Sequence, residues 1–211
     1  KNIIGAANDV IAKNKNRVEK NVFTTNEDGE KITLYAAMNG GDEAEYIART
    51  ANKLIGEGIS PSSIAVLYRT NFQSRALEEA FLNYGVSYQL LGTKFYERKE
   101  IKDVLSYLRL AMNPGSSADL ARIINEPARG IGKVTMLKVI EGRRSDLTGA
   151  ALEKVTRFDD MMMDIAAEAR TKKLSSTLKF IIARTGMETE FKKSGTDEDL
   201  SRLENLRELV S

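Results

Sequence analysis

Apolar and polar positions follow two patterns along the chain, and the first pattern mixes strands with helices. The segment SSIAVLYR (62–69) is a continuous apolar run that ends abruptly in polar residues, which is typical of a buried parallel strand. SRALEEAFLNYG (74–85) has the apolar spacing of an amphipathic helix. VSYQLLG (86–92) then predicts another strand. This region therefore indicates strands connected by helices.

The residues that precede this region continue the same alternation. Residues 2–13 predict a helix, and VFTTNEDGEKITLYAA (22–37) predicts two strands around a central Asp-Gly turn. GGDEAEYIARTANKLIGEG (40–58) predicts a second helix, with Asp42 as its N-cap and Gly56 at its end. Strands and helices in this order predict a three-layer α/β domain with a parallel sheet.

The second pattern begins at about Arg98 and is helical throughout. Apolar residues recur at i, i+3 and i+4, with no strand pattern between them. Pro127 and the Asn-Pro-Gly at 113–115 separate some of these segments. The Met161–Met163 cluster is interpreted as core filling rather than a binding surface. We expect an all-helical domain, or part of one, from the segments 100–112, 117–126, 133–142, 159–171, 174–185 and 198–211.

Composition limits what the chain can be. With 211 residues of which 42% are hydrophobic, it can bury one good core or two small ones. It has no apolar run of about eighteen residues, so we predict no membrane span. It begins without Met and without a charged-then-apolar leader, which predicts a piece of a longer protein rather than a signal peptide. The net charge of +2 is too small to argue for nucleic-acid binding by itself.

Two residue types are absent, and each absence removes a class of chemistry. Zero Cys excludes disulfides, thiol nucleophiles and thiolate metal sites. Zero His removes the commonest general base and metal ligand, and no metal site is predicted. Any catalysis must use the remaining polar side chains or be shared with another chain segment.

The stretch PARGIGKVTMLKV (127–139) contains GIGK, which invites comparison with a nucleotide-binding P-loop. That loop needs Gly-x-x-x-x-Gly-Lys-Ser/Thr, but Pro127 stands where the first Gly belongs and Val134 stands where the hydroxyl belongs. A Gly-x-Gly between helices, flanked by Arg129 and Lys133, suits a nucleic-acid phosphate. The alternative is a plain helix connection that needs glycine for its geometry.

Arg69 follows the predicted strand at 64–68, at the strand end where ligands bind in open α/β sheets. A guanidinium there can contact a phosphate with fixed geometry. The alternatives are an ion pair with a local carboxylate such as Glu78, or exposure to water. In the next segment, Phe95 and Tyr96 could stack on bases, although packing into the core is the interpretation we favour.

Several stretches in order resemble one family, the UvrD/Rep/PcrA-type superfamily 1 DNA helicases. The opening KNIIGAANDVIAKNKNR is similar to the family segment after its third helicase motif. Between residues 136 and 193 only helical periodicity supports the likeness. The main matching stretches are IAVLYRTNFQSRALEEAF, LGTKFYERKEIKDVLSYLRLAMNP, RIINEPARGIGKVT and SRLENLREL.

The resemblance implies a RecA-like three-layer parallel sheet portion followed by an all-helical inserted domain. Residues 1–110 would be part of the second RecA-like (2A-type) domain, and residues 111–211 part of the helical accessory (2B-type) domain. It also implies that Arg69 contacts the γ-phosphate of ATP and that Tyr68 packs near the nucleotide. Contacts to the DNA backbone are implied for Arg129, Gly130, Ile131, Gly132, Lys133 and Thr135.

The resemblance further implies ATP with Mg²⁺ as cofactor of the full-length protein, with none bound by these residues alone. The implied function is unwinding of duplex DNA in repair or replication, in the bacterial cytosol or nucleoid. Implied partners are single-stranded and duplex-junction DNA, the remaining helicase domains, and repair or transcription proteins such as RNA polymerase; no membrane is implied. The alternatives are an ATP-independent DNA-binding module and a protein-interaction domain.

Overall fold

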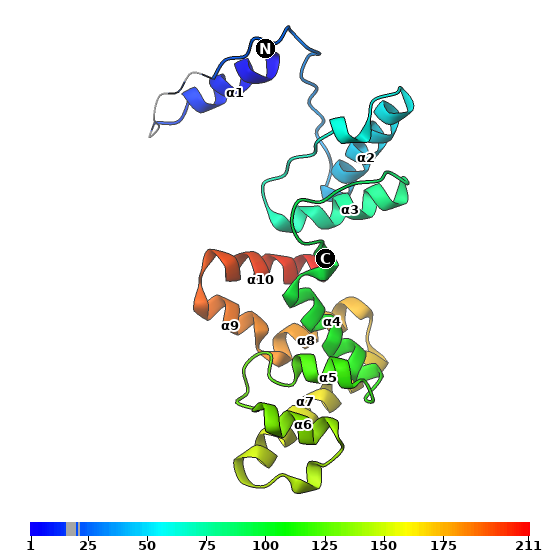
Figure 1. The fold of residues 1–211 in the computed structure, drawn as a ribbon, viewed down its shortest axis with the longest axis vertical. Helices are drawn as coiled ribbons and strands as arrows, with labels where there is room; N and C mark the ends of the chain where they lie inside the picture. The colour runs from blue at the N-terminus through cyan, green and yellow to red at the C-terminus, as the bar shows by residue number, and fades with distance from the viewer. Residues whose placement is uncertain (16–19, 21) are drawn as a thin grey trace. The chain divides into compact units, whose positions relative to one another are not determined.

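The structure is a computed structural model that describes residues 1–15, 20 and 22–211. The chain divides into two compact units, Lys1–Glu43 and Ala44–Ser211. Helices are the regular elements throughout the described residues, and no strand is assigned among them (Figure 1). The α/β prediction is therefore confirmed in its helical part only.

The first unit contains the helix α1 (Asn2–Ala12), which the sequence predicts, followed by extended backbone. The Asn2 amide donates to the Gly29 carbonyl at 2.9 Å and ties the two segments together. The two strands predicted within 22–37 are not formed. Phe23 and Leu34 are 85% and 92% exposed, and an isolated hairpin without apolar burial is marginal in water.

The helix α2 (Gly40–Gly56) ends at Gly56 as predicted, but its N-cap differs from the prediction. The side-chain oxygen of Asn39 accepts the Asp42 N–H at 3.0 Å, so Asn39 caps the helix. Asp42 lies inside the first turn, where its carboxylate accepts from the Tyr35 hydroxyl at 2.8 Å and the Met38 N–H at 2.9 Å. A carboxylate in the first turn of a helix also interacts favourably with the positive N-terminal end of the helix dipole.

The second unit begins with a small core between α2 and α3 (Ser74–Asn83), built from Ala48, Ala51, Phe81 and Val86. Residues 64–68 and 86–90 are not helical, and their alternate side chains pack on this core. The opposite faces are open, with Leu67 93% exposed. A strand requires hydrogen bonds to a neighbouring strand, which no described residue supplies, so the predicted sheet is not shown.

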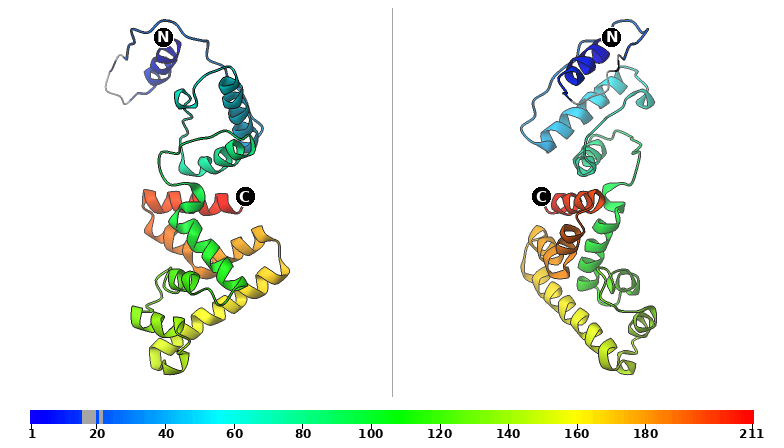
Figure 2. Two further views of the ribbon diagram at one scale, coloured as in Figure 1. Left: turned by 45° about the vertical axis from the view of Figure 1, so that its right-hand side comes forward. Right: turned by 90° about the vertical axis from the view of Figure 1, so that its left-hand side faces the viewer.

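The rest of the second unit is a helical body with one continuous core around α4. α4 packs against α5, α7, α8 and α10, and α7 is the longest helix at 23 residues (Figures 1 and 2). The core includes the fully buried Phe95, Tyr107 and Phe158. Its helices are α4 (Lys99–Met112), α5 (Ser117–Ile123), α6 (Lys133–Ile140), α7 (Gly149–Thr171), α8 (Leu174–Thr185), α9 (Met187–Ser194) and α10 (Asp197–Leu209).

This body confirms the predicted helical segments, although α7 begins at Gly149 rather than at residue 159, and it adds one helix that the sequence analysis missed. α9 follows α8 directly because Gly186 adopts φ +83°, which ends one helix and starts the next. The methionine prediction is confirmed for Met161, which is 4% exposed, whereas Met163 is 63% exposed. None of the described helices is long and apolar enough to cross a membrane.

Candidate functional site

Arg69 is held at the end of an extended segment by a closed turn. The Gln73 side-chain oxygen accepts the N–H of Arg69 at 3.1 Å, the N–H of Thr70 at 3.0 Å and the Thr70 hydroxyl at 3.1 Å. This turn leads through the 3₁₀ segment Asn71–Gln73 into α3. The backbone of Arg69 is thereby fixed, while its side chain is exposed.

Glu78 is not the partner of Arg69. It is buried and accepts the Phe95 N–H at 3.2 Å and the Tyr88 hydroxyl at 3.4 Å. The predicted alternative of an Arg69–Glu78 ion pair is therefore wrong, because the buried carboxylate already binds local donors. No carboxylate of the described residues forms an ion pair with Arg69, so its guanidinium is available to a ligand.

Tyr68 lines an open cavity of about 780 Å³ in the second unit. Arg98, Glu100 and Asn205 form part of its wall, so the cavity lies where the extended segments meet the helical body. The lining mixes acidic and basic side chains. Such a mixed wall does not select an anion by net charge.

Phe95 lies in the core, as the favoured interpretation predicts. Its ring is fully buried, with the guanidinium carbons of Arg75 and Arg98 at 5.8 Å and 5.3 Å from its centroid. Tyr96 is 48% exposed, and its hydroxyl donates to Glu79 at 3.1 Å. Phe95 is thus unavailable for stacking on a base.

The loop that carries Gly130-Ile131-Gly132 is pinned at two points. The side-chain oxygen of Asn125 accepts the N–H of Arg129 at 2.8 Å and the N–H of Ile131 at 3.1 Å. The Ile131 side chain is 4% exposed and inserts into the core. Asn125 was missed in the sequence analysis, because it binds backbone groups four and six residues further along the chain, beyond the two-residue reach of the usual Asn turn.

The two glycines of this loop differ in what they allow. Gly130 has φ +68°, and a Cβ there would lie 2.8 Å from the Lys154 Nζ. Gly132 has φ −73° and is the N-cap of α6, with open space around the position of a Cβ. Gly132 and Lys133 are exposed and Thr135 is half-buried.

The N-terminus of α6 presents free donors. Among the described residues, no acceptor binds the backbone N–H groups of Lys133, Val134 and Thr135, which is usual for the first turn of a helix. Such N–H groups and the helix dipole together favour an anion. The loop can therefore accept a phosphate at a surface that side chains leave open.

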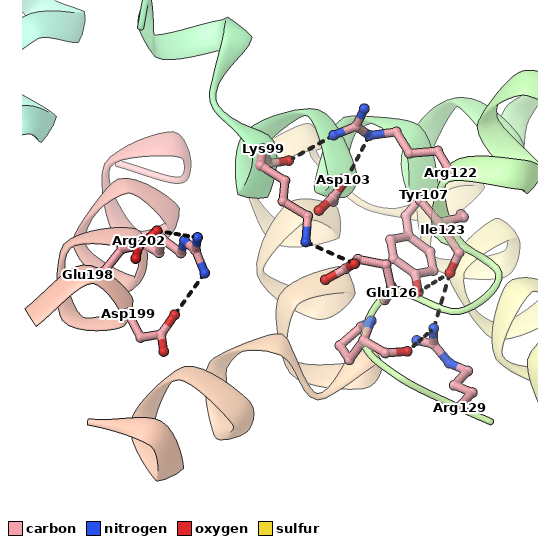
Figure 3. Close-up of polar contacts among 11 residues, drawn as sticks. Lys99, Asp103, Tyr107, Arg122, Ile123, Glu126, Arg129, Glu198, Asp199 and Arg202 are labelled. Carbon is pink, nitrogen blue, oxygen red and sulfur yellow. Dashed lines mark hydrogen bonds and ion pairs between the residues drawn. The ribbon is translucent and has the colours of Figure 1, made fainter. Parts of the chain in front are cut away.

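The guanidinium of Arg129 is directed into the fold (Figure 3). It donates to the carbonyls of Ile123 at 3.1 Å and Pro127 at 3.0 Å, and it lies 5.6 Å from the Tyr107 ring centroid. Burial raises the pKa of the Tyr107 hydroxyl, which donates to the Glu126 carbonyl at 2.7 Å. Arg129 therefore holds the loop together, and a DNA contact by its side chain stays a prediction.

Lys154, on α7, is a basic residue of this loop region that sequence spacing did not indicate. Its Nζ donates to the Gly130 carbonyl at 3.0 Å. Lys154 and Gly130 are 24 positions apart in sequence, so only the packing of α7 against the loop brings them together. The ammonium adds positive charge beside the exposed backbone of Gly130.

The described residues contain no group of three or more Asp, Glu, His or Cys side chains arranged to bind a metal ion. The Mg²⁺ that the resemblance implies therefore has no fitting ligand set among them. The Arg69 side chain is exposed, and the sequence contains no phosphate-binding loop of the Walker type.

The model of the UvrD-like helicase C-terminal domain matches residues 1–211, the whole chain. The chain belongs to this family. This UvrD-like domain is 39% identical over 228 residues to a Staphylococcus epidermidis protein named ATP-dependent DNA helicase PcrA. It is 38% identical over 227 residues to a Staphylococcus aureus protein of the same name. Each match covers 100% of this UvrD-like domain and 31% of the relative's length.

Proposed function

We propose that this UvrD-like domain is part of a full-length ATP-dependent DNA helicase that translocates on DNA and unwinds duplex, in repair or replication, in the bacterial cytosol. The observation that carries the proposal is the exposed guanidinium of Arg69, free of ion pairs among the described residues. Family membership over the whole chain and the names of the relatives support it.

The RecA-like sheet belongs to the same proposal. Residues 64–68 and 86–90 each bury one face on α2 and α3 and leave the other open. We infer that they become parallel strands when further strands of the full-length protein pair with them. The exposed Leu67 and Leu91 support this, because each would be buried by a neighbouring layer. The division into 1–110 and 111–211 stays a prediction.

Within the ATP site, the proposed role of Arg69 is to contact the γ-phosphate, and that of Tyr68 is to pack near the base or ribose. ATP and Mg²⁺ would be held mainly by the remainder of the full-length protein. A guanidinium stabilises the charge that develops on the transferred phosphoryl group. This use requires an arginine that is not engaged by a local carboxylate, which is the state of Arg69.

The test is Arg69→Ala in the full-length protein, with Arg49→Ala on the exposed face of α2 as a control. Loss of an arginine of this kind lowers ATP turnover by about 10³–10⁵-fold. We expect DNA affinity to change little and the control to turn over ATP normally. Unchanged turnover in Arg69→Ala would make Arg69 an ordinary exposed residue.

At the other site, we propose that the backbone N–H groups of Gly132 to Thr135 bind a phosphate of duplex DNA. The Lys133 side chain and the Lys154 ammonium add charge beside them. Contacts of this kind carry no sequence information, so binding should be sequence-indifferent and should weaken with salt.

The two alternatives predict different behaviour. An ATP-independent duplex-binding module has no use for Arg69, so Arg69→Ala would leave every activity unchanged. A pure interaction domain, docking RNA polymerase or a repair protein, would also be insensitive to changes at Gly132. The free guanidinium of Arg69 favours the helicase over both.

A further inference from the structure

Two arginines near the buried Phe95 ring hold α10 against the start of α3. The guanidinium of Arg98 lies 5.3 Å from the ring centroid, and its Nη1 donates to the Asn205 Oδ1 of α10 at 2.7 Å. The guanidinium of Arg75 lies 5.8 Å from the centroid, and its Nη1 donates to the backbone carbonyl of Glu208 in α10. The last helix of the body is thereby joined to the segment after Arg69.

Arg98 has the larger set of partners. Its Nη2 donates to the Asn71 carbonyl at 2.9 Å and to the Ser74 Oγ at 2.9 Å. Asn205 in turn donates through Nδ2 to Glu100 at 2.7 Å. Ser74, Asn205 and Glu100 are 0%, 4% and 5% exposed, so this part of the network is buried and its members satisfy one another. Arg98 is half-buried and Asn71 is exposed, at the wall of the cavity.

The network reaches Arg69 through a single turn. Asn71 and Gln73 belong to the same 3₁₀ segment. Arg98 fixes the carbonyl of Asn71, and the Gln73 side chain fixes the N–H of Arg69 at 3.1 Å. A displacement of the Asn71 carbonyl therefore moves the Gln73 acceptor and the backbone from which the Arg69 side chain extends.

We propose that Arg98 is a positioning residue. It fixes the turn at residues 69–73 against α10, so that the guanidinium of Arg69 is held at a defined place. The proposal rests on the proposed function of Arg69. The helical body supplies a rigid surface. Arg98 connects this surface to the turn at residues 69–73, and Arg69 would contact the phosphate.

The chemistry requires an arginine at position 98. A planar guanidinium donates in several directions at once, whereas a lysine ammonium on a flexible stem cannot reproduce that fork. Burial lowers the pKa of Arg98, and the nearby Glu100 and Glu78 partly offset this effect. The side chain stays charged at neutral pH, and charge-assisted hydrogen bonds of this kind are the stronger class.

The experiment is a double-mutant cycle in the full-length protein between Arg98→Ala and Arg69→Ala, with DNA-stimulated kcat for ATP as the readout. A small misplacement of a group that contacts the reacting phosphate can cost about 10²-fold in rate. We expect a kcat loss of that size for Arg98→Ala alone, with little change in KM. In the Arg69→Ala background we expect Arg98→Ala to change kcat by less than about twofold, because both changes act through one group.

The controls separate positioning from general stability. Arg202→Ala removes another α10 arginine, which pairs with Glu198 and Asp199 of its own helix, and should leave kcat unchanged. Duplex affinity at the Gly132 loop should be unchanged in Arg98→Ala. If Arg98→Ala does not fold, Arg98→Lys is carried through the same cycle with a smaller expected loss.

The outcomes are distinguishable. Equal kcat losses from the Arg98 change in both backgrounds would overturn the positioning role while leaving the role of Arg69 intact. A parallel loss of kcat and duplex affinity would also overturn it, since that pattern indicates a general loss of fold. An Arg69→Ala variant with normal turnover would remove the proposed function, and the positioning role with it.

Discussion

At the scale of single residues, the two glycines of the 130–132 loop have different roles. Gly130 is needed for the backbone conformation, whereas Gly132 is proposed to allow close contact with a phosphate. Gly130 needs its glycine for the backbone, because its φ is +68° and Lys154 lies against the position of a Cβ. Gly132 has an ordinary φ of −73° and open space. The fold therefore requires glycine at 130 but not at 132.

This difference predicts that the two glycines contribute unequally to stability. Gly130→Ala should lower the free energy of unfolding by about 1–2 kcal/mol, the cost of placing an L-residue in the left-handed region. Gly132→Ala should change it by less than about 0.5 kcal/mol, as is usual at open surface positions. Urea denaturation of both variants measures the two values, and equal losses would contradict the assignment.

The same geometry makes position 132 suitable for testing DNA contact. Gly132→Val should weaken affinity for duplex, because a branched side chain blocks the approach of a phosphate to the α6 N-terminus. Single-strand affinity should change little. The measurement is fluorescence anisotropy in the full-length protein, after circular dichroism confirms the fold.

Two results of the Gly132→Val experiment would count against the contact. An equal loss on duplex and single strand would mean that the glycines merely hold the helical part together. Unchanged affinity on both would remove the loop from the DNA path. A smaller magnitude of the slope of log affinity against log salt in Gly132→Val would support the contact. Each neutralised phosphate contributes about 0.9 to that magnitude.

At the scale of elements, a carboxylate in the first turn of α5 helps to join this helix to α4. The Asp119 Oδ1 accepts from the Arg109 Nη2 at 2.8 Å, and its Oδ2 accepts from the Ser116 hydroxyl at 2.7 Å. Ser116 is the N-cap and accepts the Asp119 N–H at 3.4 Å. Slight burial raises the pKa of Asp119, but the hydrogen bonds from Arg109 and Ser116 outweigh it and leave the pKa below its usual value.

A lowered folded-state pKa fixes the pH dependence of this contribution. The stabilisation of the fold by the Asp119 carboxylate is complete above the pKa of an unfolded Asp, about 3.9. It is lost as pH falls through the pKa of Asp119 in the folded chain. Asp119→Asn should therefore cost about 1 kcal/mol at pH 7, the size of a helix-cap contribution. The difference from the unsubstituted chain should shrink toward zero as pH falls from the unfolded pKa through the lower folded one.

Denaturation at several pH values measures this effect. Asp160→Asn serves as a matched control, because Asp160 is exposed on α7 and no ion pair to it is formed among the described residues. A cost for Asp119→Asn that persists undiminished at low pH would mean that the charge is not responsible.

At the scale of the whole molecule, ATP hydrolysis requires more than these residues contain. The chain has no Gly-x-x-x-x-Gly-Lys-Ser/Thr segment, and its described residues present no metal-ligand group. We expect the purified 211-residue chain to show no DNA-stimulated ATPase above background, with the full-length protein as the positive control. Robust turnover by the chain alone would overturn the proposal that ATP and Mg²⁺ are held mainly by the remainder of the full-length protein.

The helices and the extended segments differ in how far the sequence predicts them. α3, α4, α7, α8 and α10 follow from apolar spacing because a helix satisfies its backbone hydrogen bonds within itself. α9 was missed because METEFKKS has only two apolar residues, Met187 and Phe191, which is too few to show a period. The segments at 64–68 and 86–90 are apolar enough for strands, but a strand needs a neighbour.

The sequence by itself determined the helical body, the absence of a P-loop and the family, because each is a matter of local spacing or of residue identity. It also located Arg69 and the Gly130–Gly132 loop. Only the tertiary structure decided what their neighbours do: Arg129 turns into the core, Lys154 reaches the Gly130 carbonyl and Arg98 links Asn71 to Asn205. These contacts join residues from different elements, and side-chain partners across packed helices depend on how the helices pack, which spacing along the chain does not encode.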